Sequence, residues 1–171
     1  RTSVAADWHF LLGKFVPFEE VTEEFFDWTM NTNLKGAFFT VQKAAPLFSR
    51  GAAVVLNASI SGHIGQPGAS VYGASKAAVI NLAKTLSTDL LARGVRVNAI
   101  SPGPIATPIF DRMGLSESEA RQLRDSIAEK VPLRRFGQPD EIAAAVLYLS
   151  SPDSAFVVGT ELIVDGGMIQ L

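Results

Sequence analysis

Three side chains in one stretch of the sequence could share a proton-transfer reaction. Tyr72 and Lys76 stand four residues apart where an apolar-periodic stretch begins, so a helix would place both on one face. A phenol has a pKa of about 10 and is a poor base at neutral pH, but a nearby ammonium favours the phenolate and lowers that pKa. Ser59 ends a short apolar run and could donate a hydrogen bond to a substrate carbonyl oxygen. The spacing therefore predicts general acid–base chemistry with Tyr72 as the proton carrier.

The same residues also allow a purely structural interpretation. Tyr72 would then be a half-buried ring with a satisfied hydroxyl, and Lys76 a solvated amine with a buried stem. The setting favours the functional alternative, because a Gly/Pro-rich loop joins the run that ends at Ser59 to the helix that carries Tyr72. Two secondary elements would thus converge on the two hydroxyl groups.

The stretch resembles the active-site segment of the short-chain dehydrogenases/reductases, which move a hydride between a nicotinamide cofactor and a carbonyl or alcohol. The resemblance rests on Ser59, on the step of thirteen residues to Tyr72, and on the run Y-G-A-S-K. Further runs follow the order of that family: N-T-N-L-K-G around Asn33, R-V-N-A-I-S-P-G-P-I-A-T-P from Arg96 to Pro108, and V-D-G-G around Asp165. The resemblance covers residues 15–171.

The resemblance implies a role for each matching residue. Tyr72 would exchange the proton, Lys76 would lower its pKa and hold the cofactor ribose, and Ser59 would polarise the carbonyl. Asn33 would hold a water that links the lysine to solvent. The implied contacts to NAD or NADP are Tyr72, Lys76, Pro102 and Gly103 near the nicotinamide, the backbone of Ile105 at its carboxamide, and Thr107 toward phosphate or amide. Without the resemblance, Asn33 could lie on a solvated helix face and the segment Ser101–Pro108 could be a rigid connector.

Helices and strands that could position these residues alternate along the chain. Thr22 is the expected cap of a long helix, Ala52–Leu56 and Val95–Ile100 read as buried strands, and Thr160–Val164 as the last strand. The apolar positions expected to face the core are Phe26, Met30, Leu34, Phe38, Val41, Ala45 and Phe48 in the first helix, and Ala78, Leu82, Leu86 and Leu90 in the Tyr72 helix, which Gly94 would cap. Ser116 and Glu119 form a capping box for a helix to about Lys130, and Pro139 begins another to about Leu149.

This order predicts an α/β fold with a doubly wound parallel sheet, a Rossmann-like three-layer sandwich that is N-terminally truncated. A dinucleotide site needs a Gly-rich turn that opens a helix after the first strand, and the sequence contains no such turn. The stretch that would distinguish NAD from NADP is also missing. Residues 1–171 are therefore expected to form a single partial domain, the catalytic half, with an edge strand near Trp8–Leu12.

Composition excludes several classes of partner. A net charge of -2 over 171 residues leaves no basic stripe for nucleic acid, and no run is long enough to span a membrane. The chain has no Cys and no His/Asp/Glu cluster with metal-ligand spacing, and the cytoplasm is the default location. The two long helices also carry apolar residues outside their core-facing stripes: Phe25, Phe39, Val79 and Ile80. These residues predict packing against a second copy, as in the homodimers and homotetramers of the resembled family.

Three functions stay open at this point. The first is an NAD(P)-dependent oxidoreductase that acts on a small-molecule carbonyl or alcohol. The second is a non-catalytic remnant that serves as an oligomerisation or interaction module. The third is a hydrolase with Ser59 as nucleophile, which is weak because no G-x-S-x-G run surrounds Ser59 and neither His9 nor His63 has a supporting pattern. His9 is expected to be a surface or partly buried ring without a catalytic role, and His63 is expected to be exposed to solvent.

Overall fold

The chain forms a parallel sheet of four strands in the order β1-β2-β3-β4. The computed structural model describes residues 3–6, 15–108 and 116–171, with side chains from residue 15 onward in these ranges. The strands are β1 (Ser3–Ala6), β2 (Ala53–Asn57), β3 (Arg96–Pro102) and β4 (Glu161–Val164). All three neighbouring pairs are parallel. The carboxyl ends of the strands therefore share one edge, as the predicted α/β fold requires.

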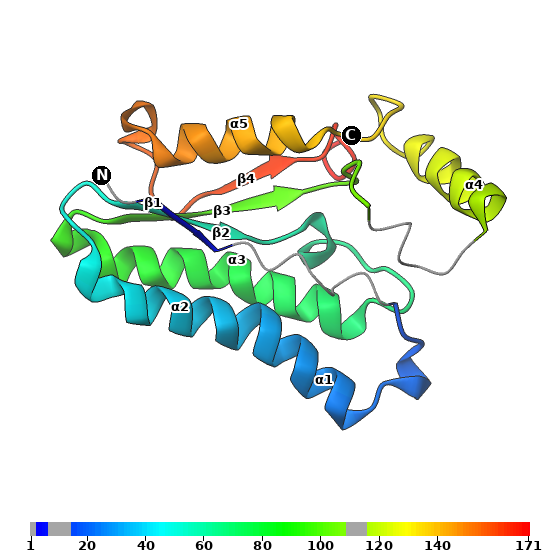
Figure 1. Ribbon diagram of the computed structural model, residues 1–171, viewed down its shortest axis with the longest axis horizontal. Helices are drawn as coiled ribbons and strands as arrows, with labels where there is room; N and C mark the ends of the chain where they lie inside the picture. The colour runs from blue at the N-terminus through cyan, green and yellow to red at the C-terminus, as the bar shows by residue number, and fades with distance from the viewer. Residues whose placement is uncertain (1–2, 7–14, 109–115) are drawn as a thin grey trace.

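Helices cover both faces of this sheet (Figure 1). The helices α1 (Glu23–Met30), α2 (Gly36–Ala44) and α3 (Ser70–Leu90) form one layer, and α5 (Pro139–Ser150) lies on the opposite face. The helix α4 (Glu117–Ala128) lies apart from both layers, beyond the end of the sheet toward which the strands point. The three-layer arrangement leaves the carboxyl edge of the sheet for the candidate site.

Apolar side chains fill both interlayer spaces. Val54, Leu56 and Val97 pack against Val79 and other residues of α3, while Val55 and Ile100 pack against Leu149 of α5. β2 and β3 are thus buried on both faces, which explains why their sequences show no alternation. Burying one such aliphatic side chain stabilises the fold by about 1.5–3 kcal/mol, so these two strands anchor the domain.

The long helix predicted from Thr22 exists but is interrupted. Thr22 Oγ1 accepts a hydrogen bond from the Phe25 amide at 3.2 Å, and a π turn at Asn31–Lys35 separates α1 from α2. The predicted core positions Phe26 and Phe38 are wrong, since they are 46% and 36% exposed. The buried positions are spaced by four instead: Thr29, Asn33, Ala37 and Val41. In a regular α-helix each step of four drifts by about 40°, and the wider π turn removes part of that drift.

The other predicted helix and strand ends in the described ranges hold within a few residues. Gly94 follows α3 in the left-handed conformation at φ 71°, and Ser116 and Glu119 form the capping box of α4, as predicted. Val79 and Ile80, however, are buried against the sheet, so they are not available to a second copy. The strand predicted at Trp8–Leu12 lies outside the described residues. None of the helices in the described ranges has the length and apolar character needed to span a membrane.

Candidate active site

Ser59 lies just beyond β2, at the carboxyl edge of the sheet. Its Oγ caps a 3-10 turn, Ile60–Gly62, by accepting a hydrogen bond from the Ser61 amide at 3.1 Å. The residue is 9% exposed. Because the Ser61 amide uses one lone pair of Oγ, the hydroxyl hydrogen stays available for donation. The turn therefore orients Ser59 as a buried hydrogen-bond donor.

Tyr72 and Lys76 lie on the first two turns of α3, on one face of the helix as predicted. The Lys76 Nζ is 5.7 Å from the centroid of the Tyr72 ring, and it donates a hydrogen bond to the Asn57 carbonyl at 2.9 Å. Lys76 is 6% exposed, and lysines are rarely buried to this degree unless they are paired. The end of β2 and the start of α3 thus bring the ammonium beside the phenol.

The pKa of Tyr72 differs from the sequence-based expectation. Burial of the phenol raises its pKa above the ordinary value of 10.0, and a side-chain hydrogen bond with Ser59 acts in the opposite direction. The predicted lowering by Lys76 is therefore not the outcome in this structure, because desolvation penalises the phenolate more strongly than its neighbours favour it. At neutral pH, Tyr72 carries its proton and can act as an acid.

Asn33 joins the site through a residue that sequence reasoning missed. Its Nδ2 donates to Ser75 Oγ at 2.8 Å, and Ser75 Oγ in turn donates to the Tyr72 carbonyl at 2.7 Å. Asn33 is 5% exposed, and its Oδ1 has no hydrogen-bond partner within the described part of the chain. A buried acceptor without a partner costs about 1–3 kcal/mol, and π turns occur frequently at functional sites. The signal for Ser75 was its place in the run Y-G-A-S-K.

The segment after β3 is fixed by contacts to β4 and to Gly137. The Gly103 amide donates to the Val164 carbonyl at 3.0 Å, and a Cβ at Gly103 would lie 2.7 Å from the Cα of Asp165. Ile105 forms an isolated parallel bridge with Gly137, made by the Pro104 carbonyl and the Ala106 amide. In a parallel bridge the peptide groups of the central residue point the other way, so the bridge leaves the backbone of Ile105 free to face a ligand.

The remaining residues predicted on this segment occupy less constrained positions. Pro102 is the last residue of β3 and is partly buried, whereas Thr107 is exposed. Ser101 and Pro102 thus belong to the strand and not to the loop predicted for Ser101–Pro108. The backbone hydrogen bonds that fix the segment run to β4 and to Gly137.

A second polar cluster lies next to the turn that follows Ser59. His63 Nε2 is 2.7 Å from Glu161 Oε1, and the same carboxylate oxygen accepts the hydroxyl of Ser101. His63 is indeed exposed, as predicted, but its pairing with a residue 98 positions away was not foreseen. Since both Ser101 and His63 bond to one oxygen, the imidazole does not stand between a hydroxyl and an acid. The cluster therefore lacks the order of a Ser-His-acid triad, and the hydrolase hypothesis gains no support.

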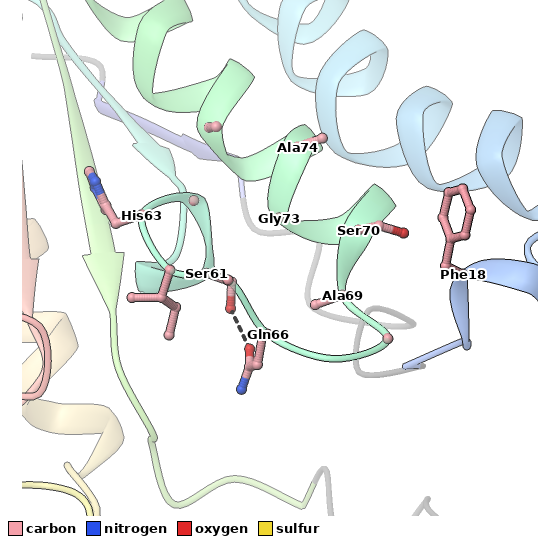
Figure 2. Close-up of a pocket in the computed structure, with 13 residues that line it drawn as sticks. Phe18, Ser61, His63, Gln66, Ala69, Ser70, Gly73 and Ala74 are labelled. Atoms are coloured by element: carbon pink, nitrogen blue, oxygen red, sulfur yellow. Dashed lines mark hydrogen bonds between the residues drawn. The ribbon is translucent and has the colours of Figure 1, made fainter.

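A hollow lies on a different side of α3 from the Tyr72–Lys76 pair. It measures about 520 Å³ and is lined by residues from the loop after Ser59, the start of α3 and Phe18. Figure 2 shows Ser61 and Gln66 joined at one side of this hollow, with Ser70 and Phe18 at the other. Gly73 and Ala77 each lie about 100° around the helix from Tyr72 and Lys76, respectively. The hollow is thus adjacent to the candidate site but does not contain its reactive groups.

Taken together, the geometry provides a proton donor, a second donor and a cation at one sheet edge. Tyr72 can give up a proton, Ser59 can donate to a developing oxyanion, and Lys76 supplies positive charge. The described residues contain no group of three or more His, Asp or Glu side chains that could hold a metal ion. Acid–base chemistry at an oxygen of a small molecule is what this arrangement supports.

Comparison with protein families finds one match over nearly the whole chain. The family profile described as Enoyl-(Acyl carrier protein) reductase matches residues 5–169. Among curated proteins, the oxidoreductase asL5 of Sarocladium schorii is 42% identical over 161 residues, which cover 93% of this chain and 63% of the relative. The 3-oxoacyl-[acyl-carrier-protein] reductase FabG of Thermotoga maritima is 38% identical, with 86% of this chain and 58% of the relative covered. The 4-formylbenzenesulfonate dehydrogenase TsaC1/TsaC2 of Comamonas testosteroni is 41% identical, with coverages of 86% and 59%.

Solved structures give the same result. A short-chain dehydrogenase/reductase of Brucella melitensis, described as a glucose/ribitol dehydrogenase, superposes with a TM-score of 0.87 at 29% identity. The alignment covers 99% of this chain and 65% of that one. A putative short-chain alcohol dehydrogenase of Sinorhizobium meliloti gives a TM-score of 0.82 at 34% identity, with coverages of 91% and 61%. The chain thus spans about three fifths of the length of the proteins it matches.

Proposed function

Because this chain belongs to the short-chain dehydrogenase/reductase family, we propose that it carries the catalytic residues of an NAD(P)-dependent oxidoreductase that interconverts a carbonyl and an alcohol. The observation that carries the proposal is the meeting of Ser59, Tyr72 and Lys76. Tyr72 shares a hydrogen bond with Ser59, and the Lys76 ammonium lies 5.7 Å from the phenol ring. The three groups come from two different elements, and their types match the chemistry of carbonyl reduction.

In the direction of reduction, the phenol of Tyr72 donates its proton to the carbonyl oxygen of the substrate. The raised pKa of Tyr72 suits this role, since the phenol holds its proton at neutral pH until negative charge develops on that oxygen. The Ser59 hydroxyl donates a hydrogen bond to the same oxygen, and Lys76 stabilises the phenolate that remains. A bound nicotinamide cofactor supplies the hydride. In the direction of oxidation, the same residues take the proton back.

Several residues fit the nicotinamide end of such a cofactor. Lys76 is a buried amine at the sheet edge that can donate to ribose hydroxyls, and the bridge to Gly137 leaves the peptide groups of Ile105 for a carboxamide. Pro102 and Gly103 would pack against the nicotinamide ring, and Thr107 would reach phosphate or amide. The choice between NAD and NADP depends on residues that this sequence does not contain.

Asn33 would complete a path for protons. Its buried Oδ1, without a partner in the described ranges, is suited to accept a hydrogen bond from a water. Such a water would connect the Lys76 ammonium to solvent and let the Tyr72 phenolate regain its proton after each turnover. The π turn that carries Asn33 supports this role because single π turns inside α-helices occur frequently at functional sites.

The substrate class follows from the names of the relatives only at a coarse level. The FabG relative is named for a 3-oxoacyl group and the TsaC relative for a formyl group, and both are carbonyl groups. We therefore propose a small-molecule carbonyl or alcohol as the substrate of this chain.

We also propose that the chain pairs with a second copy through α1 and α2. Four large apolar side chains are exposed on these helices and on the turn that follows them: Phe26, Phe38, Phe39 and Leu47. Monomeric proteins rarely expose apolar side chains of this size in groups, and a second copy would cover them.

Cofactor binding tests the proposed activity directly. NADH and NADPH are titrated into the 171-residue chain, and reduction of a panel of aldehydes and ketones is then followed. Tyr72→Phe should lower turnover by about a hundredfold or more, lower cofactor affinity much less, and leave the fold unchanged. Tyr148→Phe, on α5, is the matched control and should behave as wild type. A folded chain that binds neither cofactor would contradict the proposal and would favour an oligomerisation or interaction module instead.

A further inference from the structure

The turn that follows Ser59 is held from two sides. On one side it leans on α3, where Gly62 and Gly73 permit close contact: a Cβ at Gly62 would lie 2.9 Å from the Ala77 amide, and one at Gly73 would lie 2.8 Å from the Ser61 carbonyl. On the other side, the residue that follows the turn, His63, contacts β4: its Nε2 is 2.7 Å from Glu161 Oε1. The turn that orients Ser59 is thus placed between a helix and a strand.

The contact between His63 and Glu161 ties the turn to β4 through a carboxylate that is itself held in place. The Glu161 side chain is 13% exposed, and its Oε1 accepts both from His63 Nε2 and from the hydroxyl of Ser101, which is fully buried. A carboxylate only accepts hydrogen bonds, so the imidazole must carry a hydrogen on Nε2. Ser101 fixes the carboxylate in turn, because its own backbone is part of β3. In Figure 2, the His63 side chain points away from Gln66.

We propose that His63 and Glu161 are positioning residues that act through Ser59. The contact of His63 with Glu161 fixes the turn Ile60–Gly62 relative to β4, and the Ser61 amide of that turn donates to Ser59 Oγ at 3.1 Å. Neither residue touches the substrate in this proposal. It rests on the proposed function only for its kinetic effect, because the geometry of Ser59 relative to Tyr72 can be measured without turnover.

The physical reason is the sensitivity of the Ser59 hydrogen bond to small displacements. A displacement of about 1 Å in a catalytic group can cost up to about a hundredfold in rate. Without His63 the turn keeps its contact to α3 but loses its tie to the sheet. A smaller displacement is then expected, with a fall of about tenfold in kcat and little change in cofactor affinity.

Tyr72 provides a readout that needs no activity. The Ser59 hydrogen bond lowers the pKa of the phenol, so loss of that bond should raise it further. The chain has two tyrosines, and Tyr148→Phe leaves Tyr72 as the only phenol whose ionisation changes the near-ultraviolet absorbance. Rapid mixing to alkaline pH records this ionisation before the chain unfolds.

The experiment compares variants in this Tyr148→Phe background. His63→Ala and Glu161→Ala should each raise the Tyr72 pKa and lower kcat, whereas His63→Gln, whose amide can still donate to Glu161, should restore both. In a Ser59→Ala background, His63→Ala should have no further effect on either quantity, because the group through which it acts is gone. Glu20→Gln, an exposed carboxylate in the turn before α1, serves as the control.

The outcomes separate this inference from the proposed function. Equal effects of His63→Ala with and without Ser59 would overturn the inference, since His63 would then act on general stability or on the substrate. An unchanged Tyr72 pKa in both Ala variants would overturn it as well. If the pKa moves as expected in a chain without oxidoreductase activity, the positioning role stands and the proposed function falls.

Discussion

Asn33 Nδ2 donates a hydrogen bond to Ser75 Oγ at 2.8 Å, across 42 residues of sequence. The bond connects the π turn between α1 and α2 to the helix that carries Tyr72 and Lys76. Ser75 is fully buried and passes the contact on to the Tyr72 carbonyl. The position of α3 is therefore coupled to the π turn between α1 and α2.

Replacement of Asn33 by Ala should destabilise the chain by about 1–3 kcal/mol, because Ser75 would lose its buried donor and the proposed water, which satisfies Asn33 Oδ1, would lose its acceptor. The proposed proton path would be lost as well, so turnover should fall more than cofactor affinity. Urea unfolding and steady-state kinetics measure the two effects. Asn31→Ala lies on the same turn but is exposed, and it should change neither quantity. Equal stability of the two variants would contradict the role of the bond.

Gly73→Ala should destabilise the chain although Ala favours helices. Helix propensity alone would stabilise this change by about 1 kcal/mol. The new Cβ, however, would lie 2.8 Å from the backbone carbonyl of Ser61, which cannot move without the turn behind Ser59. Overpacking of this kind costs about 1–3 kcal/mol, so the net effect should be unfavourable, and turnover should fall with it.

The matched control for this change is Gly65→Ala, whose Cβ would meet nothing within 4 Å. Its effect on the unfolding free energy should stay within about 0.5 kcal/mol. A Gly73→Ala variant that is more stable than wild type would show that the turn and α3 are not in tight contact.

The ion pair of Arg135 and Glu141 should make the free energy of unfolding depend on pH in the acidic range. Arg135 Nη1 donates to Glu141 Oε2 at 2.8 Å, and Arg135 Nη2 donates to Glu141 Oε1 at 2.7 Å. These hydrogen bonds, together with one from the Gln138 amide, lower the pKa of Glu141 from 4.5 to about 2. A lowered folded-state pKa adds stability that is present above 4.5 and is lost as the pH falls toward about 2. Urea unfolding across this range should show a smaller loss for Glu141→Gln than for wild type, while Glu117→Gln should match wild type.

Replacement of Phe39 by Ser should weaken self-association. Phe39 is 44% exposed on α2, so the change should leave the fold intact while it removes apolar surface from the proposed interface. Light scattering at micromolar concentration should show a dimer or tetramer for wild type and a smaller species for the variant. Phe156→Ser provides the control, since Phe156 is fully exposed next to the opposite layer. A wild-type chain that is monomeric under these conditions would contradict the proposal.

Local sequence determined the elements and the pairing of the central groups. The spacing of Tyr72 and Lys76 places them on one helix face in any α-helix, and Thr22, Ser116 and Gly94 mark helix ends through hydrogen bonds and conformations that span only a few residues. The continuous apolar runs of β2 and β3 predicted strands covered on both faces. These features depend on neighbours in the chain, and a single sequence contains those neighbours.

Tertiary structure decided the features that depend on distant neighbours. The π turn kept Asn33 in line with Thr29 and Ala37 and left Phe26 and Phe38 of the predicted stripe exposed, which no helical periodicity could show. Burial raises the pKa of Tyr72, whereas the neighbouring Lys76 alone predicted a lowered pKa. The sequence could not show this, because desolvation depends on every layer that packs around the ring. The pairing of His63 with Glu161 arises only when β4 takes its place beside β3, since 98 residues separate the two side chains and neither lies in a motif that predicts the other.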